Sequence, residues 1–146
     1  MTNLNTHALS PGFSNPVLDA QKAFRAILEA MAHPTRLVPI ACDLRPPHPL
    51  TKASAAICLT LLDFETTLWT DLDIDSSSLN WLRFHCSCPI VSQSRSAQFA
   101  LVVDHRQMLR LDHFSQGDEE YPERSATLIV QVAEIMPVGW VVPNHQ

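Results

Sequence analysis

The stretch Ala126-Thr127-Leu128-Ile129-Val130-Gln131-Val132-Ala133 indicates the fold class most clearly. Its centre, residues 128–130, is an unbroken apolar run next to β-branched neighbours, which is typical of a strand. A run without alternating polar positions suits a strand that other elements cover on both faces, as in a parallel sheet. We therefore expect residues 126–133 to form a buried strand.

Helical and extended patterns alternate along the chain before this strand. Helices are predicted over 16–33 after the cap Asn15, over 52–62 after the cap Thr51, and through Phe84 after the serine cluster 76–78. Strands are predicted at 37–40, 66–70, 90–91 and 99–103, one or two helical turns at 107–111, and a polar loop at 112–125. This alternation predicts an α/β protein, a layered mixed sheet with flanking helices.

The length of 146 residues suits a single domain. We expect a flexible N-terminal arm at 1–14, an α/β domain at 15–135 and an atypical C-terminal tail at 136–146. Since a domain of this size buries roughly 70% of its unfolded surface, it needs neither disulfides nor a metal to form a core.

The composition excludes several classes of partner. Lysine and arginine are scattered and the net charge is −5, so the basic surface that binds nucleic acid is missing. No apolar run approaches the ~20 residues of a membrane span, and residues 1–16 lack a secretory leader pattern, so we expect a cytoplasmic location. Only 17% of the residues are charged, which favours an oligomer or a subunit of a complex.

Glycine is scarce in this chain. Its three glycines are Gly12, Gly117 and Gly139, and none lies in a predicted strand-to-helix turn. Dinucleotide-binding loops and nucleotide P-loops need glycine at such turns, so neither motif can be built here.

The segment His85-Cys86-Ser87-Cys88 carries the residue types that bind zinc. A structural zinc site would need a second ligand pair, and the remaining cysteines, Cys42 and Cys58, stand alone in the sequence. We interpret the four cysteines as free, buried thiols and predict no metal site.

The segment Asp71-Leu72-Asp73-Ile74-Asp75 imitates the start of a calcium-binding loop. Such a loop requires glycine at its sixth position and glutamate at its twelfth, where this chain has Ser76 and Leu82. We therefore interpret the segment as a solvated loop before a helix.

Arg83 and His85 lie two positions apart near the end of a predicted helix. An arginine can hold a phosphate or carboxylate with two hydrogen bonds, and a histidine can transfer a proton. The structural alternative pairs Arg83 with an acidic side chain and lets His85 cap helix carbonyls. We take both residues as candidates for an interface or phosphate contact and identify no catalytic residue.

Four segments together resemble the PhnH family, whose members are subunits of the bacterial carbon–phosphorus lyase system for phosphonate degradation. The resemblance covers residues 13–134. Its segments are Pro16-Val17-Leu18-Asp19-Ala20-Gln21-Lys22-Ala23-Phe24-Arg25 leading to Met31 and His33-Pro34, Leu61-Leu62-Asp63-Phe64-Glu65-Thr66 with Trp69, Leu82-Arg83-Phe84-His85 with Pro89-Ile90-Val91, and Tyr121-Pro122-Glu123-Arg124-Ser125-Ala126-Thr127-Leu128.

The resemblance implies a fold like that of pyridoxal-phosphate-dependent transferases without their cofactor, a homodimer, and a core complex with the G, I and J subunits. With the G, I and L proteins, such a subunit supports the ATP-dependent ribosylation of alkylphosphonate, which forms ribose 1-phosphonate 5-triphosphate as adenine leaves. The residues agree with a cofactor-free protein, because a pyridoxal Schiff base needs a lysine and both lysines, Lys22 and Lys52, lie in amphipathic helix patterns.

The end of the chain departs from the family. The segment Met136-Pro137-Val138-Gly139-Trp140-Val141-Val142-Pro143 does not resemble the usual continuation, so we expect a truncated or frameshifted copy with an exposed edge at strand 126–133. We favour a non-catalytic subunit of a multi-subunit transferase or lyase. The alternatives are a stand-alone metal-dependent enzyme that uses His85, Cys86 and Cys88 on a small molecule, and a non-functional remnant.

Overall fold

Three short strands form a parallel sheet in the part of the chain that the computed structural model describes, residues 10–137. Trp69 lies beside Ala100, and Ala100 beside Leu128. The spatial order is β1 (Leu68–Thr70), β2 (Phe99–Val102) and β3 (Thr127–Val130). The predicted α/β class is confirmed, but these strands are all parallel where we expected a mixed sheet.

Each of the three helices begins at the predicted capping residue. Asn15 accepts a hydrogen bond from the N–H of Leu18, Thr51 from that of Ser54, and Ser76 from that of Leu79. These bonds satisfy N–H groups that the first helical turn leaves without a partner. The helices are α1 (Pro16–Ala32), α2 (Lys52–Leu61) and α3 (Ser77–Cys86). Helix α3 extends two residues beyond the predicted end.

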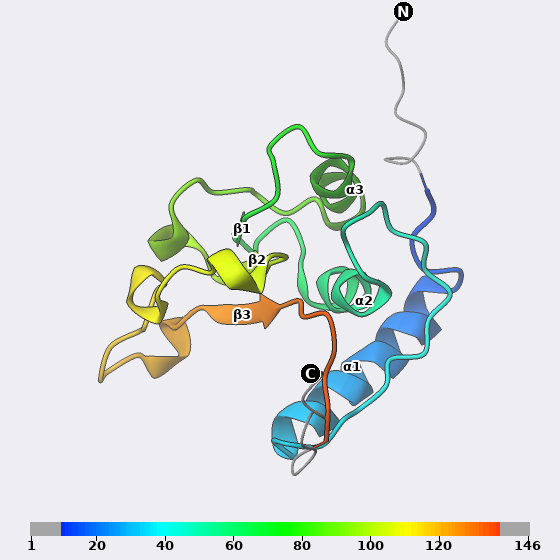
Figure 1. The fold of residues 1–146 in the computed structure, drawn as a ribbon, viewed down its shortest axis with the longest axis horizontal. Coiled ribbons are helices and arrows are strands. Elements are labelled where there is room, and N and C mark those ends of the chain that lie inside the picture. The colour runs from blue at the N-terminus through cyan, green and yellow to red at the C-terminus, as the bar shows by residue number, and fades with distance from the viewer. Residues whose placement is uncertain (1–9, 138–146) are drawn as a thin grey trace, which may run out of the picture.

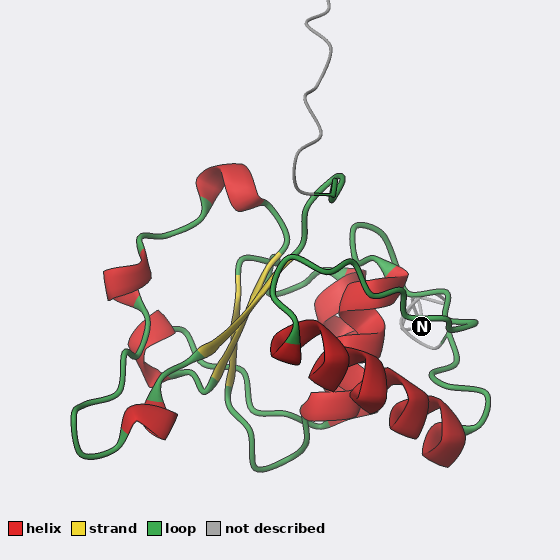
Figure 2. Cartoon of the chain, turned by 90° about the horizontal axis from the view of Figure 1, so that it is seen from below, coloured by secondary structure: helices red, strands yellow, loops and turns green. Residues whose placement is uncertain are grey.

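The three α-helices lie on one side of the sheet, and short 3₁₀ turns lie on the other (Figure 2). Helix α2 lies between α3 and α1 and packs against both (Figure 1). Ala55 and Ala56 of α2 are fully buried, because their small side chains allow the helix to approach its neighbours closely. The core that results contains Leu68, Trp81 and Leu101.

Strand β3 is less covered than its apolar sequence predicts. Ile129 is buried in the core with Leu101, whereas Val130 is 38% exposed. Thr127 is also exposed, so the two faces of β3 are not both fully covered. Among residues 10–137, β3 is an edge strand with a neighbour on one side only. The expectation of a buried strand is therefore wrong, and the expected exposed edge is present in this part of the chain.

Two further predicted strands are absent from the described residues. Residues 37–40 have no strand partner, and Pro39 cannot donate to a ladder. Ile90 forms a single parallel bridge with Leu68, so residues 90–91 do not extend into a strand. The helical turns predicted at 107–111 occur on either side, at His105–Gln107 and Leu111–His113.

The predicted N-terminal arm lies largely outside the described residues, but its last part is packed onto α3. The carbonyl of Ser10 accepts a hydrogen bond from the indole N–H of Trp81, at 2.9 Å. Residues 138–146 of the predicted tail also lie outside the described part. Within residues 10–137, every helix is too short or too polar to cross a membrane.

Candidate functional site

The structure does not bring Arg83 and His85 together. Positions two apart on a helix point in nearly opposite directions. The Nε2 atom of His85 lies 2.8 Å from the carbonyl oxygen of Ser10, and its ring packs on that of Trp81 with centroids 4.6 Å apart. His85 therefore holds the N-terminal segment, and it does not cap the carbonyls of its own helix.

Arg83 points to the other side of α3, toward the loop that follows β1. Its guanidinium donates to the carbonyl oxygen of Ile74 at 3.4 Å. Among residues 10–137 no ion pair joins Arg83 to a carboxylate, so the structural alternative of an acidic partner is not realised there. The positive charge of a half-buried arginine is thus left available to a ligand.

Arg83 contributes to a small pocket between β1 and α3. The pocket has a volume of about 200 Å³ and is lined by residues of β1, of the following loop, of α3 and of the segment 90–92. Leu72, Ile74, Leu79 and Ile90 supply apolar walls, and no acidic residue lines the pocket. A cationic group beside apolar walls can bind a small anion that carries an alkyl group.

The thiols of Cys58, Cys86 and Cys88 are buried near one another in the core. Burial, with a smaller contribution from Cys88, raises the pKa of Cys58 to about 12. The hydrogen bond between the Cys86 and Cys88 thiols raises the pKa of Cys86, and burial adds to this, while the same bond lowers the pKa of Cys88. Cys58 and Cys86 are therefore protonated thiols, which are poor ligands and poor nucleophiles.

No group of three metal-binding side chains forms within the described residues. His85 points toward Ser10, away from the buried thiol of Cys86 with which the sequence groups it. The metal-dependent alternative is therefore not favoured.

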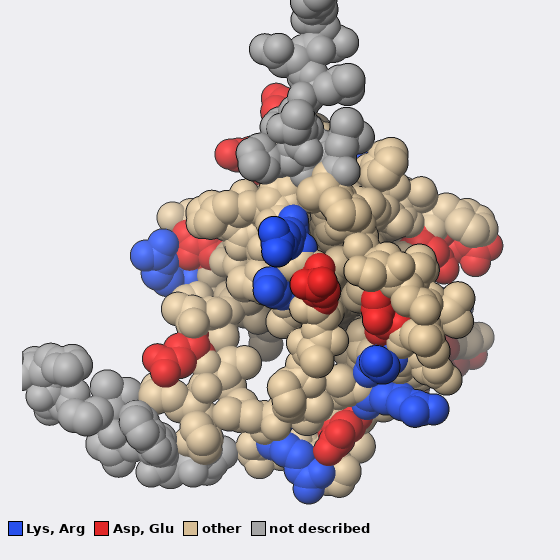
Figure 3. Space-filling model, turned by 90° about the vertical axis from the view of Figure 1, so that its right-hand side faces the viewer, with Lys and Arg blue, Asp and Glu red and all other residues tan. Residues whose placement is uncertain are grey.

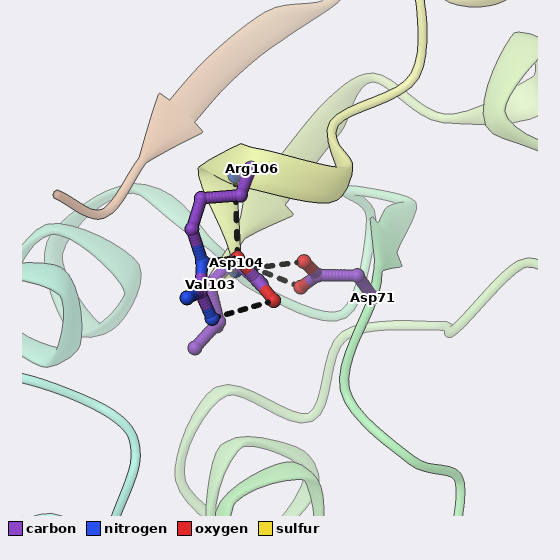
Figure 4. Close-up of polar contacts among 4 residues, drawn as sticks. All are labelled: Asp71, Val103, Asp104 and Arg106. Atoms are coloured by element: carbon purple, nitrogen blue, oxygen red, sulfur yellow. Dashed lines mark hydrogen bonds and ion pairs between the residues drawn. The ribbon is translucent and has the colours of Figure 1, made fainter.

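Sequence reasoning missed the role of Asp71, which joins the carboxyl ends of β1 and β2. Its Oδ1 accepts the N–H of Val103 at 2.8 Å and its Oδ2 that of Asp104 at 2.9 Å (Figure 4). The signal was available, because Asp71 directly follows a predicted strand and parallel strands end at the same edge of a sheet. The rest of the acidic segment, Asp73–Asp75, is an exposed loop as predicted.

Asp104 also pairs with Arg106, whose Nε lies 3.0 Å from its Oδ1 (Figure 4). The hydrogen bond from Arg106 lowers the pKa of the Asp104 carboxyl, and the pair is exposed to solvent. Its charges neutralise each other at the edge of the sheet, so this pair offers no free group for acid–base chemistry at neutral pH.

Helix α1 exposes much of its apolar surface. Val17 is 78% exposed and Met31 70%, and Phe24 and Leu28 are also exposed, while Ala23 is its only buried residue. Charged side chains are scattered over the right-hand side of the molecule, with uncharged surface between them (Figure 3). An exposed apolar helix face of this kind is typical of proteins that associate with a partner.

Fold and contacts together define, within residues 10–137, a parallel α/β protein with a small anion-compatible pocket between β1 and α3. Among the side-chain hydrogen bonds of that part, none joins a serine, threonine or cysteine to a histidine ring, the contact that would activate a nucleophile.

The family model described as bacterial phosphonate metabolism protein (PhnH) matches residues 11–141, so the chain belongs to the PhnH family. The chain is also 34% identical over 124 residues to the alpha-D-ribose 1-methylphosphonate 5-triphosphate synthase subunit PhnH of Rhizobium meliloti (strain 1021). The match covers 84% of this chain and 62% of that relative, so the chain spans less than two thirds of the relative's length.

Proposed function

We propose that this chain is a subunit of the carbon–phosphorus lyase core complex and supports the ATP-dependent ribosylation of alkylphosphonates. The observation that carries the proposal is the match to a curated synthase subunit over 84% of the chain. The reaction forms ribose 1-phosphonate 5-triphosphate, and the chain contributes to it without a catalytic residue of its own. The complex works in the cytoplasm, where ATP is available.

The surface of the chain supports a role in assembly. Exposed apolar side chains on α1, such as Val17 and Met31, would lose contact with water on binding a partner. At about 25 cal/mol per Å² of buried apolar area, such residues can contribute several kcal/mol to association. We propose a homodimer that joins the G, I and J subunits.

Co-purification tests this function. The tagged chain, expressed together with the G, I and J subunits, is expected to recover all three proteins in fixed proportion. Two α1 variants test whether the apolar face matters: Met31→Asp places a charge on that face, whereas Lys22→Asp places an acidic side chain on an exposed position of another face of the same helix. Recovery should fall for Met31→Asp and persist for Lys22→Asp.

A growth assay supplies the second readout. A strain that lacks its own copy of the subunit should grow on methylphosphonate as sole phosphorus source when it expresses this chain. A soluble, folded chain that neither recovers the partner subunits nor restores growth would overturn the proposal and would favour the non-functional remnant.

A further inference from the structure

The pocket between β1 and α3 lies where hydrogen bonding along the free side of β1 stops. Leu68 bonds to the segment after α3 through both of its backbone groups: its N–H donates to Pro89, and its carbonyl accepts from Val91 at 2.9 Å. Alternate residues of a parallel strand face the same neighbour. The N–H of Thr70 therefore faces residues 90–92, like that of Leu68.

No backbone partner meets the N–H of Thr70 in the described part of the chain, because the bonding on this side ends at Val91. Thr70, Ser92 and Arg83 all line the pocket. Three residues that carry a backbone N–H, a hydroxyl and a guanidinium therefore line one small space. Together they offer an anion several hydrogen-bond donors, one of which carries a full positive charge.

The remaining walls select for a short apolar group. Leu79 is buried, Leu72 and Ile90 are half-buried, and these three side chains form apolar parts of the pocket wall. A volume of about 200 Å³ holds roughly six water-sized groups, at about 30 Å³ per water. This space accommodates a tetrahedral oxyanion with a short alkyl chain.

We infer that this pocket binds a short-chain alkylphosphonate, with the oxyanion on Arg83, Thr70 and Ser92 and the alkyl group against Leu72 and Ile90. The choice of a phosphonate among tetrahedral oxyanions rests on the proposed function. The pocket lining contains no histidine or carboxylate that could act as a base, so the pocket presents the ligand without transforming it.

A titration followed by two-dimensional ¹H–¹⁵N NMR tests the inference on the full chain. Methylphosphonate should saturate its site and shift the Thr70 amide and the Arg83 side-chain resonances. Arg83→Gln should weaken binding by about tenfold or more, because a charge-assisted contact is lost. The matched control Arg25→Gln removes the same charge from an exposed position on α1 and should bind like the unmodified chain.

Binding of three further ligands tests whether the alkyl group of the ligand contacts the apolar wall of the pocket. Ethylphosphonate should bind about fourfold more tightly than methylphosphonate if its extra CH₂ is buried. Inorganic phosphate and propionate, which lack the alkyl group or the tetrahedral head, should bind more weakly. Leu72→Ala, which removes a wall and keeps the charge, should abolish the preference for the ethyl group even if Arg83→Gln fails to fold.

The binding and co-purification experiments can fail independently, so they distinguish an error in the pocket assignment from an error in the proposed function. Equal binding of phosphate and methylphosphonate, or an unshifted Thr70 amide at saturation, would overturn the pocket assignment, even in a chain that recovers the G, I and J subunits. A chain that binds methylphosphonate through Arg83 and never recovers those subunits would instead retain the pocket and lose the proposed assembly.

Discussion

Replacement of Asp71 by alanine should destabilise the sheet at its carboxyl edge. The Asp71 carboxylate accepts the N–H groups of Val103 and Asp104, at 2.8 and 2.9 Å, and so ties the end of β1 to the end of β2 (Figure 4). Asp71→Ala removes both acceptors and leaves the backbone of β1 unchanged. The two freed N–H groups would then depend on water.

The expected loss follows from the number and the exposure of these bonds. A hydrogen bond to a charged group contributes about 1.5–3 kcal/mol, and the lower end or less applies where the acceptor is exposed, as Asp71 is. Asp71→Ala should therefore lower the free energy of unfolding by about 2 kcal/mol. Asp71→Asn should lower it by about 1 kcal/mol, since an amide retains one acceptor oxygen and its NH₂ group cannot accept.

Urea denaturation measures both losses as a lower midpoint at an unchanged slope. Asp73→Ala is the matched control, because Asp73 is an exposed carboxylate two residues along the same loop, and its loss should cost less than about 0.5 kcal/mol. Hydrogen exchange should quicken at the Val103 and Asp104 amides. Equal midpoints for Asp71→Ala and Asp73→Ala would refute the reasoning.

Three other substitutions examine local contacts. Ser78→Ala should lower the free energy of unfolding by about 1–2 kcal/mol, because this buried hydroxyl shares its one proton between the Pro47 and His48 carbonyls, each 3.0 Å away. An unchanged urea midpoint would contradict this. Gly117→Ala should lower the free energy of unfolding by about 1–3 kcal/mol, because Gly117 has a φ of +68° and a Cβ there would lie 2.9 Å from the Pro122 carbonyl oxygen. A thermal unfolding midpoint at or above that of the unmodified chain would count against this prediction. Arg106→Ala should raise the pKa of the Asp104 carboxyl toward its ordinary value, and a ¹³C NMR titration that finds it unmoved would exclude the inferred bond.

The helix starts could be predicted from the sequence because capping is local. Asn15, Thr51 and Ser76 each bond to an N–H three residues further along the chain. The side chain and its partner belong to the same turn, so the tertiary structure is not needed to bring them together.

The strands were harder to predict because a strand requires a partner that the local sequence does not identify. Residues 37–40 have extended propensity but pair with no strand among residues 10–137, whereas Leu68–Thr70 pairs with a segment about thirty residues away. The contacts of Asp71 span 32 and 33 residues, which explains why its role was missed.

The candidate site was predicted in part. Arg83 was identified from its residue type and position, but His85 was grouped with it on proximity in sequence. The helix separates the two, and His85 contacts Ser10, a residue 75 positions away. The pocket itself lies where the backbone hydrogen bonds between β1 and residues 89–91 end. Neither the composition nor the periodicity of the sequence predicts where these bonds end.

The proposed assembly would change how strongly Arg83 attracts an anion. In a pocket open to water, the attraction between Arg83 and an oxyanion is weakened by the solvent dielectric. A partner subunit that covers the opening would exclude water and strengthen that attraction without adding any contact to the ligand. Because such coupling is reciprocal, an anion bound at Arg83 would strengthen association with that partner by the same factor. In the proposed complex, this coupling would make assembly depend on the presence of the anion that Arg83 binds.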